Sequence, residues 1–243
     1  MAGAVALRKT VILGEQAPPS RDEVLARYRR LRALTILHHS KAMAFLPRDV
    51  ILHQARRLGL AHGETIVLRN DDELNLAFDL AVHTSPAGRS RTIDRYARSA
   101  PYAKGSDEAL VLEAMCNARF ALLMVVRCHP SAGLIVTDMV REIDLWLVNE
   151  GLEISFSEGS VFATRYFGLD GFAMTTGVAI PLESSLLGHA MDLAPHLLRK
   201  SLEEAIEHRR FAEALYRAAI AEGVTARIMT IDVTAGDAAR TVE

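Results

Sequence analysis

A basic segment between residues 89 and 104 is the part of the sequence whose residue types most suggest chemistry. It sets five positive charges against the single acid Asp94, and its candidate binding residues are Arg89, Arg91, Arg95, Tyr96 and Arg98. If the helix expected over residues 92–99 extends back to Arg91, then Arg91, Arg95 and Arg98 share one face, where guanidinium groups can grip phosphates. The residues therefore predict contact with nucleic acid or a phosphorylated ligand, with a solvated helix face as the ordinary alternative.

A second arginine group lies near the start of the chain, at positions 27, 29, 30 and 32. At about 100° per helical residue these side chains spread around the helix, so they do not form one stripe for nucleic acid. A helix-turn-helix beginning at residues 48–58 is not favoured either, because the segment after Gly59 has the pattern of a strand.

The histidines offer one set with metal-ligand spacing. His189, Asp192 and His196 stand three and four residues apart and would share a helical face. Pro195 interrupts that helix, so capping and surface roles are favoured and we assign no metal site. His38 falls on the apolar stripe of the first expected helix, where a hydrogen-bonded core histidine is the ordinary interpretation.

Familiar enzyme signatures are absent from the sequence. There is no phosphate-binding loop, no Gly-x-Ser-x-Gly elbow, no His-Glu-x-x-His helix and no dinucleotide fingerprint. Cys128 and His129 are adjacent, and neighbouring side chains in a strand face opposite ways, which argues against a catalytic dyad. Acids at strand ends, such as Asp138 and Glu142, leave a hydrolase as a third hypothesis. No catalytic residue and no cofactor is assigned.

The composition is that of an ordinary globular protein. The chain has 243 residues, of which 50% are hydrophobic and 24% charged, and this length fits one large domain or two small ones. The formal charge of −2 provides no global field for holding nucleic acid or an anionic membrane. Any such binding must therefore come from a local patch.

Cysteine content and apolar runs bear on location. Two cysteines without a disulfide framework predict a reducing compartment, and the cytoplasm is the expected location. The longest apolar run, residues 120–126, is too short to span a bilayer. The apolar start of the chain is followed by Arg8 and Lys9, the reverse of a signal peptide. Neither export nor membrane insertion is indicated.

The elements that must position these residues form an α+β pattern. Helical periodicity covers residues 20–118 and returns over 183–223, while residues 119–182 show short apolar runs separated by turn residues every eight to twelve positions. The sequence predicts an N-terminal helical region, a central antiparallel five-strand meander or small barrel, and C-terminal helices. Residues 1–19 are expected to form a flexible segment and residues 224–243 a tail or edge strand.

Local signals place several boundaries. Ser20 and Glu23 form a capping box at the start of the first helix. Asp71 is the expected cap of the third helix. The dipeptide Asp170-Gly171 predicts a type I′ hairpin turn, because it supplies two residues that tolerate positive φ.

The last helix carries an apolar stripe. A helix starting near Pro195 and stopping before Gly223 repeats apolar residues at three- and four-residue steps, namely Leu198, Leu202, Ala205, Ala212, Tyr216 and Ala219. Such a helix packs on its own domain or pairs with a second copy. The preferred interpretation is a non-catalytic cytoplasmic interaction or regulatory protein that acts through protein contacts, including self-association through this helix. Binding of nucleic acid or phosphate through residues 89–98 is the alternative.

Overall fold

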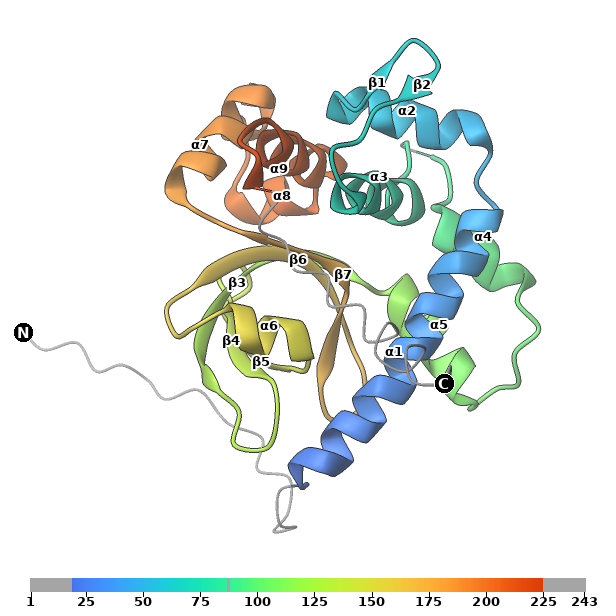
Figure 1. Cartoon of the computed structure of the whole chain (residues 1–243), viewed down its shortest axis with the longest axis vertical. Coiled ribbons are helices and arrows are strands. Elements are labelled where there is room, and N and C mark those ends of the chain that lie inside the picture. The colour runs from blue at the N-terminus through green and yellow to red at the C-terminus, as the bar shows by residue number, and fades with distance from the viewer. Residues whose placement is uncertain (1–18, 87, 225–243) are drawn as a thin grey trace, which may run out of the picture.

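The computed structural model describes residues 19–86 and 88–224. The predictions made for residues 1–18 and for the tail from residue 225 onward lie outside this part of the chain. The described chain begins with helices, continues through a barrel of strands and ends with helices, so the predicted α+β fold class is confirmed (Figure 1).

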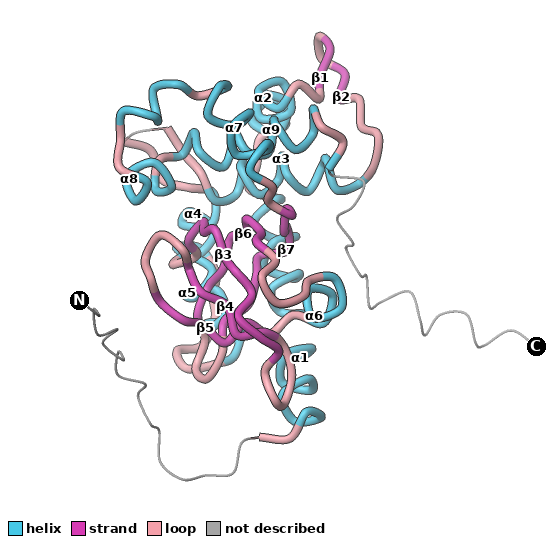
Figure 2. Tube along the Cα trace, turned by 90° about the vertical axis from the view of Figure 1, so that its left-hand side faces the viewer, coloured by secondary structure: helices cyan, strands magenta, loops and turns pink. Residues whose placement is uncertain are grey.

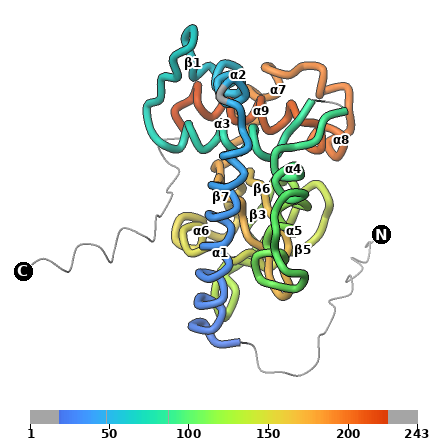
Figure 3. The backbone as a smooth tube through the Cα atoms, turned by 90° about the vertical axis from the view of Figure 1, so that its right-hand side faces the viewer, coloured from blue at the N-terminus to red at the C-terminus, as the bar shows by residue number. Residues whose placement is uncertain are grey.

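The N-terminal region contains five helices and one small hairpin. The helices are α1 (Arg21–Ala44), α2 (Arg48–Leu58), α3 (Asp71–His83), α4 (Thr92–Ser99) and α5 (Asp107–Cys116). The hairpin of β1 (Ala61–His62) and β2 (Thr65–Ile66) joins α2 to α3. At about 1.5 Å per residue, the 24 residues of α1 extend over roughly 36 Å, which lets this helix follow the barrel and reach the helices above it (Figure 3).

Five strands close into a barrel in the order β3-β4-β5-β7-β6. They are β3 (Arg119–Cys128), β4 (Leu134–Asp138), β5 (Ile143–Leu147), β6 (Val161–Gly168) and β7 (Ala173–Pro181), with α6 (Glu150–Ser155) between β5 and β6. Neighbouring strands pair antiparallel except β5 and β7, which meet in parallel at the single pair Leu147 and Ala173. One backbone hydrogen bond, from the Val148 amide to the Ala173 carbonyl at 2.9 Å, extends this junction.

The C-terminal region is a run of short helices. These are α7 (Ser184–Leu193), the 3₁₀ helix η1 (Pro195–Arg199), α8 (Leu202–Glu207) and α9 (Arg209–Ala221). Together with α2 and α3 they form a helical layer on one side of the barrel, while α1, α4 and α5 lie along another side (Figures 1 and 2).

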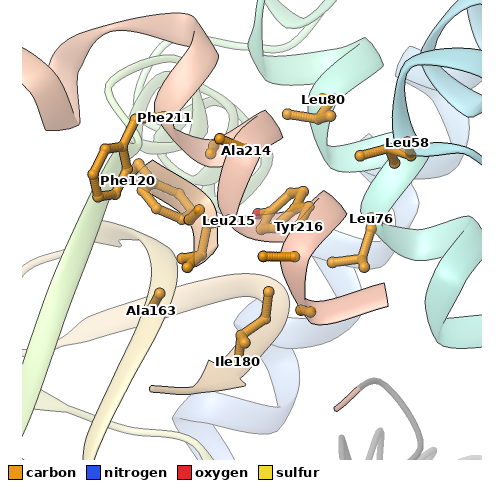
Figure 4. Packing of buried hydrophobic residues seen from close by; sticks show 14 of the residues in the cluster. Leu58, Leu76, Leu80, Phe120, Ala163, Ile180, Phe211, Ala214, Leu215 and Tyr216 are labelled. Carbon is orange, nitrogen blue, oxygen red and sulfur yellow. The ribbon is translucent and has the colours of Figure 1, made fainter. Parts of the chain in front are cut away.

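Alternation along β3 explains how the barrel carries two cores. Ala121 and Leu123 point into the barrel, where they pack with Phe162 and Leu134. Phe120 and its neighbour Leu122 point outward into the helical layer. Figure 4 shows this second core, in which Phe120 lies beside Phe211 and Tyr216 of α9. The barrel is thus filled inside and covered outside.

Several local predictions are confirmed. Both hydrogen bonds of the Ser20 capping box are present at the start of α1. The helical segment considered at residues 48–58 is α2, and Gly59 ends it in the left-handed conformation at φ +79°. Asp170-Gly171 lies in the turn of the β6–β7 hairpin, with the Leu169 amide donating to the Phe172 carbonyl at 2.9 Å.

Three details were predicted wrongly. Asn70, not Asp71, caps α3, since the Asn70 side chain accepts from the Glu73 amide. The Asp170-Gly171 turn is not type I′, because Gly171 has positive φ and Asp170 does not. The single long C-terminal helix is instead η1, α8 and α9. Ser201 begins α8 with a capping box, and His208 ends α8 in extended backbone before α9 begins.

Candidate functional site

The predicted basic segment forms helix α4, with Arg91 at its N-cap. The Arg91 guanidinium turns back to the Asp94 carboxylate, at 2.7 and 2.8 Å, and to the Cys116 carbonyl at 2.6 Å. Arg95 donates to the Thr92 hydroxyl at 3.1 Å, while Arg89 and Arg98 are exposed. Phosphate or nucleic-acid binding by this segment stays a prediction, with Arg91 already holding an acid and a carbonyl.

Tyr96, the remaining candidate of that segment, is only 4% exposed and sits in a hydrogen-bonded relay. His38 Nε2 must donate to the Glu108 carbonyl at 2.9 Å, so its Nδ1 accepts from the Tyr96 hydroxyl at 3.0 Å. Tyr96 then accepts from Tyr102, also at 3.0 Å, and Tyr102 accepts from Lys41 at 2.9 Å. This relay joins α1 to the α4–α5 region, and it gives His38 the hydrogen-bonded core role expected from the sequence.

The strand-end acids of the hydrolase hypothesis have separate roles. Asp138 is fully buried and accepts from the Arg141 guanidinium at 2.7 Å and from the amides of Val140 and Arg141, each at 3.1 Å. Glu142 is exposed and has a positive φ of 54°. Asp138 therefore stabilises the β4–β5 turn, with its carboxylate paired to Arg141, and the hydrolase hypothesis stays a prediction.

The other sequence candidates are also separated. His189 pairs with Glu222 at 2.9 Å, and His196 lies against the His208 ring, so the three proposed metal ligands do not converge. Across residues 19–86 and 88–224, no group of three metal-ligating side chains comes together. His129 stacks on Trp146 with ring centroids 3.9 Å apart, and its Nδ1 accepts a hydrogen bond from the Ser131 amide at 3.2 Å.

The apolar stripe of the last helix is used within the chain. Ala212, Tyr216 and Ala219 are buried in the core against the barrel, whereas Leu198 and Leu202 are 65% and 50% exposed. Self-association through this region stays a prediction that rests on those two leucines. Within the described ranges no helix has both the length and the apolar character needed to cross a membrane.

A cavity of about 290 Å³ lies where α1, α3 and β7 meet. One face of α1 provides the first wall, through Arg32, Ile36, His39, Ser40 and Met43. Their spacings of four, three, one and three residues keep them on one stripe of the helix. This wall therefore combines the polar side chains of Arg32 and His39 with apolar side chains.

The other two walls come from α3 and β7. From α3 the cavity is lined by Asn75, Phe78, Asp79 and Val82, again at helical spacing, and from β7 by Thr176, Gly177 and Val178. Beyond Ala173, β7 is paired with β6 on one side and has no pairing with β5 on the other. The cavity thus opens at the unpaired edge of the barrel.

Asp79 forms the floor together with charged and hydroxyl groups from three other elements. Arg165 of β6 donates to its carboxylate at 3.1, 3.1 and 3.3 Å, and the Tyr216 hydroxyl donates at 2.9 Å. The Thr176 hydroxyl donates at 3.3 Å. Side chains of Asp79 and Arg165 are only 4% and 7% exposed. We call these four residues the Asp79 network.

Charge pairing with Arg165 keeps the Asp79 carboxylate ionised. Burial alone would raise the pKa of Asp79, but the Arg165 charge and the hydrogen bonds from Arg165 and Tyr216 outweigh burial and lower the pKa to about 2. Although burial disfavours the Arg165 cation, Asp79 raises the pKa of Arg165. Burial beside the carboxylate raises the pKa of Tyr216. The floor is an ion pair with no net charge.

Two histidines meet beside the floor, with His39 Nε2 and His83 Nε2 at 3.2 Å and the rings edge to face. Burial lowers the pKa of His39 to about 4 and the pKa of His83 well below its usual value, so both are neutral near pH 7. His83 Nδ1 is buried without a partner. An unpaired acceptor nitrogen at this buried position costs less free energy than an unpaired N–H group, so we place the His83 proton on Nε2, which donates to His39 Nε2. The proton of neutral His39 then lies on Nδ1.

Arg32 is the remaining charge at the cavity. Its guanidinium donates from Nη1 to the Thr175 carbonyl at 3.2 Å. It lies over Gly177, where an added Cβ would be 3.4 Å from Nη2 and the backbone φ of +139° also favours glycine. Within the described part of the chain, Arg32 forms no ion pair. It is held in place by backbone and carries an uncompensated positive charge.

Sequence reasoning missed this site, although two signals pointed to it. Asp79 stands between Phe78 and Leu80 on the apolar face of its helix, and Arg165 interrupts a strand that is otherwise almost continuously apolar. An acid and a base in two buried elements suggest a pair, because isolated buried charges are rare. Arg32 was considered only for nucleic acid, and its role depends on β7, which is far away in the sequence.

Comparisons with known proteins give a family and no activity. Neither a curated protein nor a solved structure matches the chain. A family model described as "Family of unknown function (DUF7986)" matches residues 22–227, which cover all the elements described above except the first residue of α1. The chain belongs to the family of unknown function DUF7986.

Proposed function

We propose that this chain is a non-catalytic binding protein that takes a small molecule into the cavity between α1, α3 and β7. The observation that carries the proposal is the built polar wall of that cavity, where Arg32 has no acid partner among the described residues and His39 presents its Nδ1 proton. Ligand pockets combine apolar walls with a few placed polar groups in this way. The volume of about 290 Å³ is suited to a small ligand.

The state of the polar groups supports binding more than catalysis. Asp79 is held as a carboxylate by Arg165 and is saturated by hydrogen bonds, so it is a weak base. His39 and His83 are bonded to each other. These groups can orient a ligand, and no pair among them is arranged as a nucleophile with its base.

Ligand binding also gives the regulatory role expected from the sequence a physical basis. A molecule in the cavity would touch α1, α3 and the barrel edge at β7. It would therefore stabilise the arrangement of α1 against α3. A binding partner that recognises the exposed face of α1 outside the cavity, where Leu37 is 39% exposed, could then respond to the ligand.

The test is fragment screening by ¹H–¹⁵N NMR, with the shifts of the Gly177 and Ser40 amides as the readout. Ser40→Trp, at the exposed rim of the cavity, should fill it and abolish binding. Ala33→Trp adds the same side chain at an exposed position of α1 outside the cavity and should leave binding unchanged. The proposal is wrong if no fragment shifts the cavity amides, or if Ser40→Trp binds as well as Ala33→Trp.

A further inference from the structure

The charge of the cavity selects a class of ligand. Asp79 is negative, but Arg165 lies against it and cancels its field, and His39 is neutral. The Arg32 cation then remains as the only uncompensated charge among the described lining residues. A bound ligand with one negative charge would complete the balance, whereas a cation would face Arg32 without a partner.

The geometry of the donors narrows the class further. Arg32 uses Nη1 for the Thr175 carbonyl, and its Nε and Nη2 have no protein acceptor in the described chain. A guanidinium presents a planar edge that matches the two oxygens of a carboxylate. His39 follows Arg32 by seven residues on the same helical face, so its Nδ1 proton is a second donor on the same wall.

The rest of the lining combines apolar residues with the polar side chains of Ser40, Asn75 and Thr176. Ile36 and Met43 flank the two donors on α1, and Phe78 and Val82 face them from α3. A ligand therefore needs an apolar body as well as an anionic head. Dianionic phosphate fits less well than carboxylate, because one cation and one neutral N–H would balance only half of its charge.

We propose that the cavity binds a monocarboxylate with a short apolar body, the carboxylate on Arg32 and His39 and the body between α1 and α3. This inference rests on the proposed function, since it names the ligand class of the same cavity. Arg32 is fixed by Thr175 and Gly177 before the ligand arrives, so little side-chain ordering opposes binding.

The test compares matched probes that differ in the head group alone. Hexanoate and phenylacetate are titrated into the protein beside hexanamide and phenylacetamide, with hexylphosphonate as the phosphate-like arm, and Kd is read from the NMR shifts of the cavity amides. Each acid should bind at least about tenfold more tightly than its amide, because it gains a charge-assisted hydrogen-bonded pair. Hexylphosphonate should bind more weakly than hexanoate.

Two arginine variants locate the head group. Arg32→Met should lower hexanoate affinity to the level of hexanamide and leave hexanamide binding unchanged. Arg30→Met is the matched control, since it removes the same charge from an exposed residue of α1 whose partner is Asp107. It should leave hexanoate affinity within about twofold, which excludes a general charge effect.

The outcomes separate the two proposals. If the amides bind in the cavity as tightly as the acids, the cavity is a binding site and the carboxylate assignment is wrong. Tighter binding of hexylphosphonate than of hexanoate overturns the assignment in favour of a phosphate-like head. If neither acids nor amides shift the cavity amides, both the inference and the proposed function fail. Equal losses in Arg32→Met and Arg30→Met would also remove Arg32 from the site.

Discussion

Replacing Asp79 by asparagine tests the central physical claim about the site, that the Asp79 network stabilises the junction between the helical layer and the barrel. The Asp79→Asn substitution would keep the shape of the side chain but remove its charge. Arg165, with 7% of its side chain exposed, would then be a buried cation without a counter-ion. Breaking a buried pair in this way costs about 3–5 kcal/mol of unfolding free energy, because the remaining charge stays desolvated.

The pH dependence gives a second, independent readout of the same residue. The pKa of Asp79 is about 2 in the folded protein, against an ordinary value of 3.8. The unfolded chain therefore binds the proton first, and the folded carboxylate contributes about 2 kcal/mol above pH 4. That contribution is lost as the pH falls from about 4 to about 2, and Asp79→Asn should lack this part of the acid loss.

The assay is urea unfolding followed by circular dichroism, for the wild type, Asp79→Asn and the double variant Asp79→Leu/Arg165→Met. The double variant removes both charges and should be less destabilised than Asp79→Asn, even though Tyr216 and Thr176 lose an acceptor. A loss below about 1 kcal/mol for Asp79→Asn would refute the reasoning. So would a double variant less stable than the single one.

Three further changes test other parts of the structure. Tyr96→Phe removes the central hydroxyl of the hydrogen-bonded relay and should cost about 1–3 kcal/mol in urea unfolding; an unchanged midpoint would deny the relay any role in stability. Gly133→Ala should lower the unfolding free energy by at least about 2 kcal/mol, because φ is +79° and the new Cβ would lie 2.4 Å from a backbone oxygen. Gly63→Ala is the control: its new Cβ meets no atom, so only the strain of the left-handed backbone remains, about 1 kcal/mol. Because the pKa values of His39 and His83 are lowered, the unfolded chain takes up protons from pH 6.5 downward while the folded site stays neutral to about pH 4. The melting temperature Tm should therefore fall over this interval. A flat Tm would contradict the burial of the pair.

The fold was predictable because local and periodic signals agreed. The capping box at Ser20, the prolines before helices and the change from helical to strand patterning at residue 119 each act over a few residues. The closure of the barrel was left open because it depends on β5 meeting β7 across α6 and β6, at a single residue pair. No local pattern encodes such a distant junction.

The candidate site was hidden for the same reason. Its polar groups come from α1, α3, β6, β7 and α9, and each looks ordinary within its own element. The segment chosen from the sequence was a basic one whose arginines were expected to share a helical face, and there Arg91 is neutralised by Asp94 nearby. A lone charge in an apolar stretch, such as Arg165, is a better guide than a cluster on a polar surface.

The narrow junction between β5 and β7 leaves the barrel with something that a fully closed barrel lacks, which is a strand edge. Past Ala173, one side of β7 offers backbone groups that another extended chain could pair with. Arg32 occupies the Thr175 carbonyl on that edge, and α1 lies across it. The residue that we assign to ligand recognition therefore also occupies a backbone acceptor on this edge, which leaves one group fewer for another extended chain to pair with.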